Sequence, residues 1–260
     1  RVYARAPAHL NQNETTAFLA ALFAVVLWSA LPVLRGVAAE VPPLQMTAIA
    51  LTFAAVVEAL RGRMTQQPRQ ATGTRLPVAR GLGLAVTLVG AIAFYFVGLD
   101  RAPAAQVTLV TYTWPLMFVS ASEIVTRGRV HKLVLAGGAV AFAGCAALVM
   151  EDANGSFAAS HVLGYAAGLA SGASWVGYSL LLRHGPTMGP GAWPRVFMLA
   201  AGVALALHLL LEATLWPLSG AALAVSALIG AGPYGLAFVA WAYGVRCGPA
   251  RSVGLLAYAV

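Results

Sequence analysis

The chain consists of long apolar runs separated by short clusters of charge. A helix needs about 20 mostly apolar residues to cross a hydrocarbon core of about 30 Å, and runs of that length recur along the whole sequence. Of the 260 residues, 60% are apolar and only 9% are Asp, Glu, Lys or Arg, whereas these four make up about 25% of a soluble domain. Such a chain has too little charge to cover a soluble surface. The sequence therefore predicts an all-α integral membrane protein.

Nine segments are long and apolar enough to be predicted as membrane spans. They are Thr16–Leu34, Leu44–Leu60, Gly81–Leu99, Ala104–Val125, Leu133–Met150, Val162–Leu182, Trp193–Leu215, Ala221–Val245 and the run from Pro249 onward. Cys145 and Cys247 lie in or beside such segments, which indicates neither a disulfide framework nor a CxxC metal site.

The basic residues lie almost entirely in alternate loops. With the N-terminus placed inside, 14 of the 16 Lys and Arg residues fall on the inner side, and only Arg35 and Arg101 fall outside. Loops rich in Lys and Arg stay in the cytoplasm, so the pattern predicts a cytoplasmic N-terminus. This topology also explains the net charge of +8, and no nucleic-acid partner is needed to account for it.

A short motif recurs with an offset of 146 residues. The segment GLDRAPA at 98–104 returns as GVRCGPA at 244–250, and the same offset aligns Tyr112 with Tyr258. The first half holds five predicted spans, which is an odd number, so the second copy must cross the membrane in the opposite direction. Inverted repeats of this kind are typical of secondary transporters, whose halves move around a site near the midplane.

The repeat predicts a division into three parts. Residues 1–150 hold the N-terminal segment and the first five helices, 151–161 form an external linker, and 162–260 begin the second, inverted repeat. At the same offset the fifth span would recur at about 279–296, beyond the last residue. We therefore expect a parent protein of ten transmembrane helices in two inverted five-helix repeats, with about nine helices begun in this sequence.

Several residues together resemble the EamA-type branch of the drug/metabolite transporter superfamily. They are a Trp late in the first span of each half (Trp28 and Trp175), a Pro-Ala pair that opens the fourth span, Pro115 within that span and Glu123 near its inner end. The aromatic segments FYF, TYTWP, SWVGYS and FVAWAYG resemble YddG-type aromatic amino acid exporters of that superfamily. The resemblance implies export of small metabolites without a cofactor and without a nucleotide-hydrolysing subunit.

One face of the fourth span is mostly polar. It carries Thr108, Thr111, Tyr112, Pro115 and Ser122. A polar stripe that faced lipid would leave its hydroxyl groups without partners, so we expect it to face a cavity; hydrogen bonds to neighbouring helices are the alternative. Pro115 removes a backbone hydrogen bond and is predicted to kink the helix beside Trp114. Transporters bind substrates at broken helices of this kind.

Aromatic residues deep in other spans complete the predicted substrate site. The predicted substrate-binding residues are Trp28, Tyr95, Thr108, Thr111, Tyr112, Trp114, Trp175, Tyr178 and Trp241, with Pro115 as a kink or gating residue. Core packing is the alternative for each of the aromatic residues. His208 is a candidate polar relay because ionisable residues inside a membrane are often functional; the alternative is a histidine whose polar atoms are satisfied by Glu212.

These observations predict a secondary transporter that exports amino acids with aromatic and other apolar side chains, or related small metabolites, across a bacterial inner membrane by alternating access. Its expected partners are a small-molecule substrate and membrane lipid. A drug, sugar or nucleotide-sugar transporter of the same fold is the alternative. An intramembrane enzyme is the alternative from another class, but HExxH, GxxxxGK[ST] and an aspartate-rich motif are all absent from the sequence. No catalytic residue and no metal site are expected.

Overall fold

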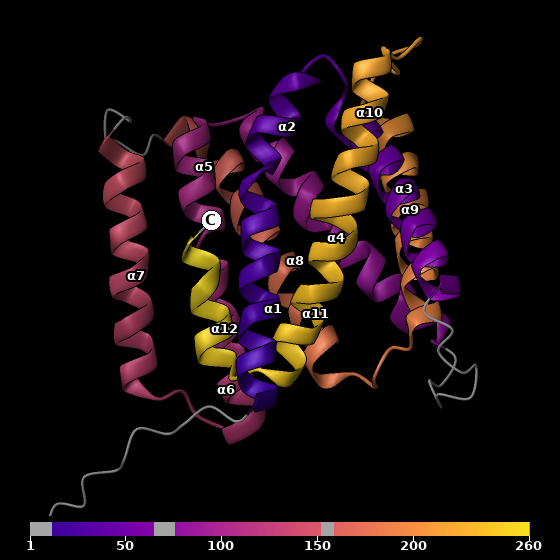
Figure 1. Ribbon diagram of the computed structural model, residues 1–260. Coiled ribbons are helices and arrows are strands. Elements are labelled where there is room, and N and C mark those ends of the chain that lie inside the picture. Colours follow the sequence, from indigo (N-terminus) through magenta and orange to yellow (C-terminus); the bar gives the residue numbers. More distant parts are fainter. Residues whose placement is uncertain (1–11, 65–75, 152–158, 260) are drawn as a thin grey trace, which may run out of the picture.

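The computed structural model describes residues 12–64, 76–151 and 159–259, and these residues form helices joined by short loops (Figure 1). Most of the predicted linker 151–161 lies outside the described residues. In the first part of the chain the helices are α1 (Gln12–Ser29), α2 (Leu31–Val37), α3 (Pro43–Met64), α4 (Val78–Leu99), α5 (Ala104–Thr111), α6 (Trp114–Arg127) and α7 (Lys132–Glu151). The later helices are α8 (Val162–His184), α9 (Trp193–Leu211), α10 (Gly220–Ile229), α11 (Ala237–Cys247) and α12 (Ala250–Leu256), with a π-helical turn at Gly230–Leu236 between α10 and α11.

Among the described residues, five helical segments are long and apolar enough to cross a membrane. They are Gln12–Val37, Pro43–Met64, Val78–Leu99, Trp193–Leu211 and Gly220–Cys247. Each coincides with a predicted span, which supports an all-helical membrane protein. The other predicted spans do not qualify for local reasons. The fourth predicted span is divided into α5 and α6. In α8, which corresponds to the sixth predicted span, several Gly and Ser residues lower the mean hydropathy. The apolar part of α7, Leu135–Gly144, is short, and α12 has seven residues.

The helices run between two sides of the bundle (Figure 1). We call the side on which α1 begins the N-terminal side; the α6–α7, α8–α9 and α11–α12 connections lie there too. The α2–α3, α4–α5 and α9–α10 connections lie on the opposite side. Of the twelve Lys and Arg residues in the described ranges, ten lie at helix ends or loops on the N-terminal side and only Arg35 and Arg101 lie opposite. The chain therefore separates its charges as the sequence predicts.

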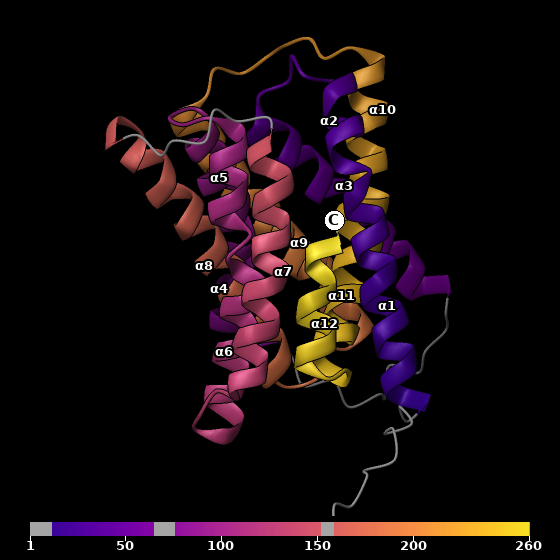
Figure 2. The same ribbon diagram turned by 90° about the vertical axis from the view of Figure 1, so that its left-hand side faces the viewer.

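Helices from the two halves of the chain pack against each other in pairs. The most extensive pairs are α4 with α8, α3 with α9, and α1 with α11. The helix α12 packs on α6, while α7 lies at the edge of the bundle against α5, α6 and α12 (Figure 2). Each half therefore completes its packing only through the other half.

Small residues allow these helices to approach closely. Ala17, Ala21 and Ala24 are fully buried on one face of α1. A Cβ atom on Gly244 of α11 would lie 2.8 Å from the Cβ of Ala21 and 3.1 Å from the carbonyl oxygen of Ala17. Association of helices in lipid depends on such close packing of small residues, because lipid tails are as apolar as the side chains.

A second stripe of small residues positions the break in the fourth span. Gly164, Gly168 and Gly172 follow one another at intervals of four residues along α8. Gly164 faces the α4–α5 connection, and Gly168 and Gly172 face α5. The hydroxyl of Thr111 donates a hydrogen bond to the carbonyl oxygen of Gly168 at 3.1 Å. A Cβ atom on Gly172 would lie 3.0 Å from the Thr111 carbonyl oxygen. The end of α5 is therefore held directly against α8.

Candidate functional site

A cavity of about 490 Å³ lies in the half of the bundle away from the N-terminal side. Its walls come from both halves of the chain. The lining residues are Trp28, Leu31, Pro32, Arg35, Pro43, Met46, Thr47, Ala91, Ile92, Tyr95, Phe96, Leu99, Thr108, Thr111, Tyr112, Trp114, Ser171, Trp175, Ile229, Tyr234, Phe238 and Ala257. The volume is typical of pockets that hold small organic ligands, which measure about 300–1,000 Å³. We call this space the central cavity.

Aromatic rings form the deep wall of the central cavity. The ring centroid of Trp28 lies 5.9 Å from that of Trp175 and 5.7 Å from that of Phe238. Trp114 lies 6.2 Å from Trp175. These rings are tilted against one another, an arrangement that stabilises each pair by about 0.5–1.5 kcal/mol beyond burial alone. The cavity therefore has a rigid aromatic wall of flat apolar surfaces.

Two interruptions of helical backbone border the same cavity. The fourth span ends its first helix at Thr111 and restarts at Trp114, and Pro115 stands at the start of the new helix. The eighth span contains the π-helical turn around Pro233. A proline inside a helix removes a hydrogen bond and clashes with the preceding turn, which accounts for both irregularities. Irregular backbone at membrane depth is tolerated where it is buried in protein or lines a cavity.

The polar atoms near the central cavity are partly engaged with protein. The Trp28 indole N–H donates to the Pro233 carbonyl oxygen at 2.9 Å, which fixes the ring against the π-helical turn. The hydroxyl groups of Tyr95 and Thr108 are hydrogen-bonded to each other at 2.8 Å. Ser171 donates to the carbonyl oxygen of Ala91 at 2.6 Å. Like the Thr111–Gly168 bond, this contact shows that some hydroxyl groups of the site also bind neighbouring helices.

Arg35 is the one charged residue among those that line the central cavity. Its guanidinium donates to the carbonyl oxygens of Ala38 at 2.5 Å and Val41 at 2.7 Å. These two bonds hold the side chain near the cavity mouth, where α2 ends. A guanidinium has five N–H donors, so donors remain for an anionic ligand.

Seven of the predicted site residues line the central cavity, and four predicted residues do not. Trp28, Tyr95, Thr108, Thr111, Tyr112, Trp114 and Trp175 are the seven. Tyr178 and Trp241 are fully buried beneath the aromatic wall, where the Trp241 indole N–H donates to Ser179 at 3.2 Å. Pro115 is buried at the start of α6 and does not line the cavity. Trp114 lines it while only 8% exposed, so it also contributes to packing.

His208 lies apart from the central cavity in a network that ties α9 to α3. Its Nδ1 atom lies 2.8 Å from the Glu212 carboxylate and its Nε2 atom 2.9 Å from the Thr214 hydroxyl. Glu212 also accepts hydrogen bonds from the backbone N–H groups of Leu44 and Gln45 at the start of α3. A carboxylate at a helix N-terminus is stabilised by the helix dipole. This geometry agrees with the alternative of a histidine satisfied by Glu212.

Tyr234, Phe238 and Arg35 are among the lining residues that the sequence analysis missed. Tyr234 and Phe238 stack on each other with centroids 5.5 Å apart, and both border the cavity with Arg35. The sequence does contain a signal for Tyr234, because Pro233-Tyr234 pairs an aromatic residue with a mid-span proline as Trp114-Pro115 does. Arg35 was counted only as a topological charge.

Comparison with known proteins gives consistent matches. Residues 15–150 match the EamA-like transporter family. Over an alignment of 261 positions the chain is 31% identical to an aromatic amino acid exporter, YddG, of Ancylobacter novellus, and the alignment covers 95% of this chain and 85% of that protein. A solved crystal structure aligns with this chain with a TM-score of 0.83 and 31% sequence identity. The alignment covers 95% of this chain and 84% of the chain in that structure.

Proposed function

Because this chain belongs to the EamA-like transporter family, we propose that it is a secondary transporter that exports amino acids with aromatic and other apolar side chains across the bacterial inner membrane. The coarser assignment, a membrane transporter of small metabolites, follows from the family and from the apolar helices of membrane length. The substrate class rests on one observation, the central cavity, whose described lining combines aromatic rings with one guanidinium.

The central cavity offers a separate partner for each part of such an amino acid. The faces of Trp28, Trp114 and Trp175 suit a flat apolar side chain. The Arg35 guanidinium suits the carboxylate, since arginine binds carboxylates through paired N–H donors. The ammonium group can lie over an indole face or against the hydroxyl groups of the fourth span. The name of the Ancylobacter relative supports this choice of substrate.

Alternating access between two inverted repeats is supported by the packing of the helices. Exchanging each span with its repeat partner converts the α1–α11 contact into the α8–α4 contact. The same exchange leaves the α3–α9 contact in place. This is the pattern expected of an approximate two-fold axis between the halves. The site then lies between two units that can move relative to each other.

The charge asymmetry supports a cytoplasmic N-terminal side. In that orientation the central cavity lies on the periplasmic half of the bundle, and this conformation presents the site toward the side of release. Tagging the N-terminus and testing its accessibility in spheroplasts measures the orientation. Accessibility of the tag from the periplasm would contradict it.

Transport by purified protein in liposomes tests the substrate class. We expect labelled tryptophan and phenylalanine to be exchanged across the vesicle membrane, and Trp175→Ala to reduce this exchange strongly. Trp216→Ala is the matched control, because Trp216 is 79% exposed and does not line the central cavity. Movement of a lipophilic cation without movement of any amino acid would show that the substrate class is wrong.

A further inference from the structure

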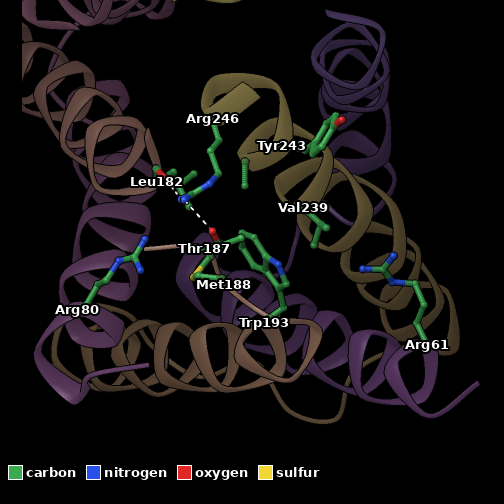
Figure 3. Close-up of a pocket in the computed structure, with 10 residues that line it drawn as sticks. Arg61, Arg80, Leu182, Thr187, Met188, Trp193, Val239, Tyr243 and Arg246 are labelled. Carbon is green, nitrogen blue, oxygen red and sulfur yellow. Dashed lines mark hydrogen bonds between the residues drawn. The ribbon is translucent and has the colours of Figure 1, made fainter. Parts of the chain in front are cut away.

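A second cavity, of about 390 Å³, is lined by residues near the helix ends on the N-terminal side of the bundle. Figure 3 shows its lining residues. This second cavity shares no lining residue with the central cavity. Three of its ten lining residues are arginines, Arg61, Arg80 and Arg246, and none is acidic. Apart from Thr187, the rest of its wall is formed by apolar and aromatic side chains, including Trp193 and Tyr243. We call it the arginine vestibule.

Two of these arginines converge on the end of α8. Figure 3 shows Arg80 and Arg246 approaching Thr187 from different walls, while Arg61 lies across the vestibule. Arg80 donates to the Pro186 carbonyl oxygen at 2.7 Å, and Arg246 donates to the Gly185 carbonyl oxygen at 2.7 Å and to the Thr187 hydroxyl at 2.9 Å. The carbonyl end of a helix attracts cations, which explains why two like charges can lie together.

Arg80 and Arg246 have no carboxylate partner within the described part of the chain, whereas Arg61 is paired with Glu58 at 2.6 Å. The Nε atom of Arg80 is buried, and no hydrogen-bond acceptor is placed against it among the described residues. An unsatisfied buried donor is unfavourable. The vestibule therefore holds two arginines whose positive charge no carboxylate of the described residues balances, and a bound anion would supply the missing negative charge.

A series of aromatic side chains connects the arginine vestibule to the central cavity. Trp193, in the vestibule wall, has its ring centroid 5.5 Å from that of Phe197. Phe197 lies 6.4 Å from Phe238, and Phe238 lies 5.9 Å from Trp175 of the central cavity. Phe197 and Phe238 are both fully buried. A continuous series of rings thus joins the two spaces through the middle of the bundle.

We propose that the arginine vestibule is a second binding site for the transported amino acid, in which Arg80 and Arg246 hold its carboxylate and Trp193 contacts its side chain. The proposal rests on the function proposed above and adds a site on the side from which an exporter takes its substrate. A carboxylate is a stronger acceptor than a backbone carbonyl. Binding therefore competes with the hydrogen bonds that hold the end of α8 and favours opening of this side.

The test measures transport from each side of the membrane separately. Protein is reconstituted in phosphatidylcholine vesicles, and its orientation is determined with a membrane-impermeant maleimide that labels the exposed Cys247. For Arg80→Gln and Arg246→Gln we expect the KM for phenylalanine on the N-terminal side to rise about 10-fold, because one charge-assisted hydrogen bond to the substrate is lost. The KM on the opposite side should change less than about twofold, and Arg246→Lys should recover part of the affinity.

Arg183→Gln is the matched control. Arg183 is also at the end of α8 and donates to the carbonyl oxygens of Val245 and Gly248, but it does not line the vestibule. We expect its KM on the N-terminal side to equal that of the wild type. An increase as large as that of Arg246→Gln would mean that loosening the helix end causes the effect, and would overturn the proposal.

Three further outcomes separate this proposal from its alternatives. If the KM effect appears only when phosphatidylglycerol is added to the vesicles, the vestibule binds a lipid phosphate and the proposal is wrong. If wild-type protein moves phenylalanine and both glutamine variants keep its KM on the N-terminal side, the vestibule proposal fails while the proposed function stands. If wild-type protein moves no amino acid at all, the proposed function itself fails.

Discussion

Glu123 connects the two halves of the chain on the N-terminal side, and we expect Glu123→Gln to lower the free energy of unfolding. Its Oε1 atom accepts hydrogen bonds from Arg251 at 2.7 Å and from Arg127 at 3.0 Å, and its Oε2 atom accepts one from the His131 backbone N–H at 2.7 Å. Arg251 belongs to α12 and Glu123 to α6. The glutamine keeps the shape of the side chain and removes its charge.

The expected loss of unfolding free energy follows from how exposed Glu123 and its two arginine partners are. The Glu123 side chain is 5% exposed, but Arg251 and Arg127 are 42% and 59% exposed. Solvent screens such half-exposed pairs, so together they contribute about 1 kcal/mol. The hydrogen bond from the backbone N–H to the buried carboxylate contributes about 1.5–3 kcal/mol. The glutamine carbonyl oxygen can still accept this hydrogen bond, which is then worth about 0.5–1.5 kcal/mol. We therefore expect Glu123→Gln to cost about 2 kcal/mol.

Equilibrium unfolding in mixed micelles measures this loss. Glu123→Gln, Arg251→Gln and the double variant form a double-mutant cycle, for which we expect a coupling energy of about 0.5–1 kcal/mol. Arg127→Gln is the control for a pair within one helix, and it should cost less than Glu123→Gln. A zero coupling energy, or equal costs for Glu123→Gln and Arg127→Gln, would refute the assignment of this carboxylate to a contact between the halves.

Three further predictions concern the central cavity and the helices around it. Pro115→Ala should slow exchange between inward- and outward-facing states more than it weakens binding, because alanine allows a more regular helix; lost affinity at a normal exchange rate would contradict this. Gly172→Ala should lower the free energy of unfolding by about 1–3 kcal/mol, since its Cβ would lie 3.0 Å from the Thr111 carbonyl oxygen. Gly202→Ala, with open space around it, should not lower it. Equal melting temperatures of the two variants would count against the close α5–α8 contact. Arg35→Gln should raise the KM for phenylalanine on the side opposite the N-terminus by about 10-fold. It should leave inhibition by phenethylamine, which lacks the carboxylate, unchanged. An equal loss of affinity for phenylalanine and phenethylamine would exclude a carboxylate contact.

The family and the membrane character could be predicted from the sequence, because both depend on local features. Apolar runs of membrane length do not need a tertiary structure to be recognised. The break at Trp114-Pro115 was also predictable, since proline lacks the N–H that a helix requires. The resemblance to EamA-type transporters is confirmed. The inverted repeat and the cytoplasmic N-terminus stay predictions.

The sequence by itself determined which segments are helical, where they break and on which side the charges gather. Only the tertiary structure decided which face of each helix borders the central cavity. Trp175 lines it while Tyr178, less than one turn away, is buried below, and Arg35 lines it although it was counted as a loop charge. The physical reason is that lipid and protein interior are both apolar, so hydrophobic periodicity does not distinguish them in a membrane helix. The rotation of each helix is set instead by close contacts between small residues such as Gly168, Gly172 and Gly244 and the opposing helices.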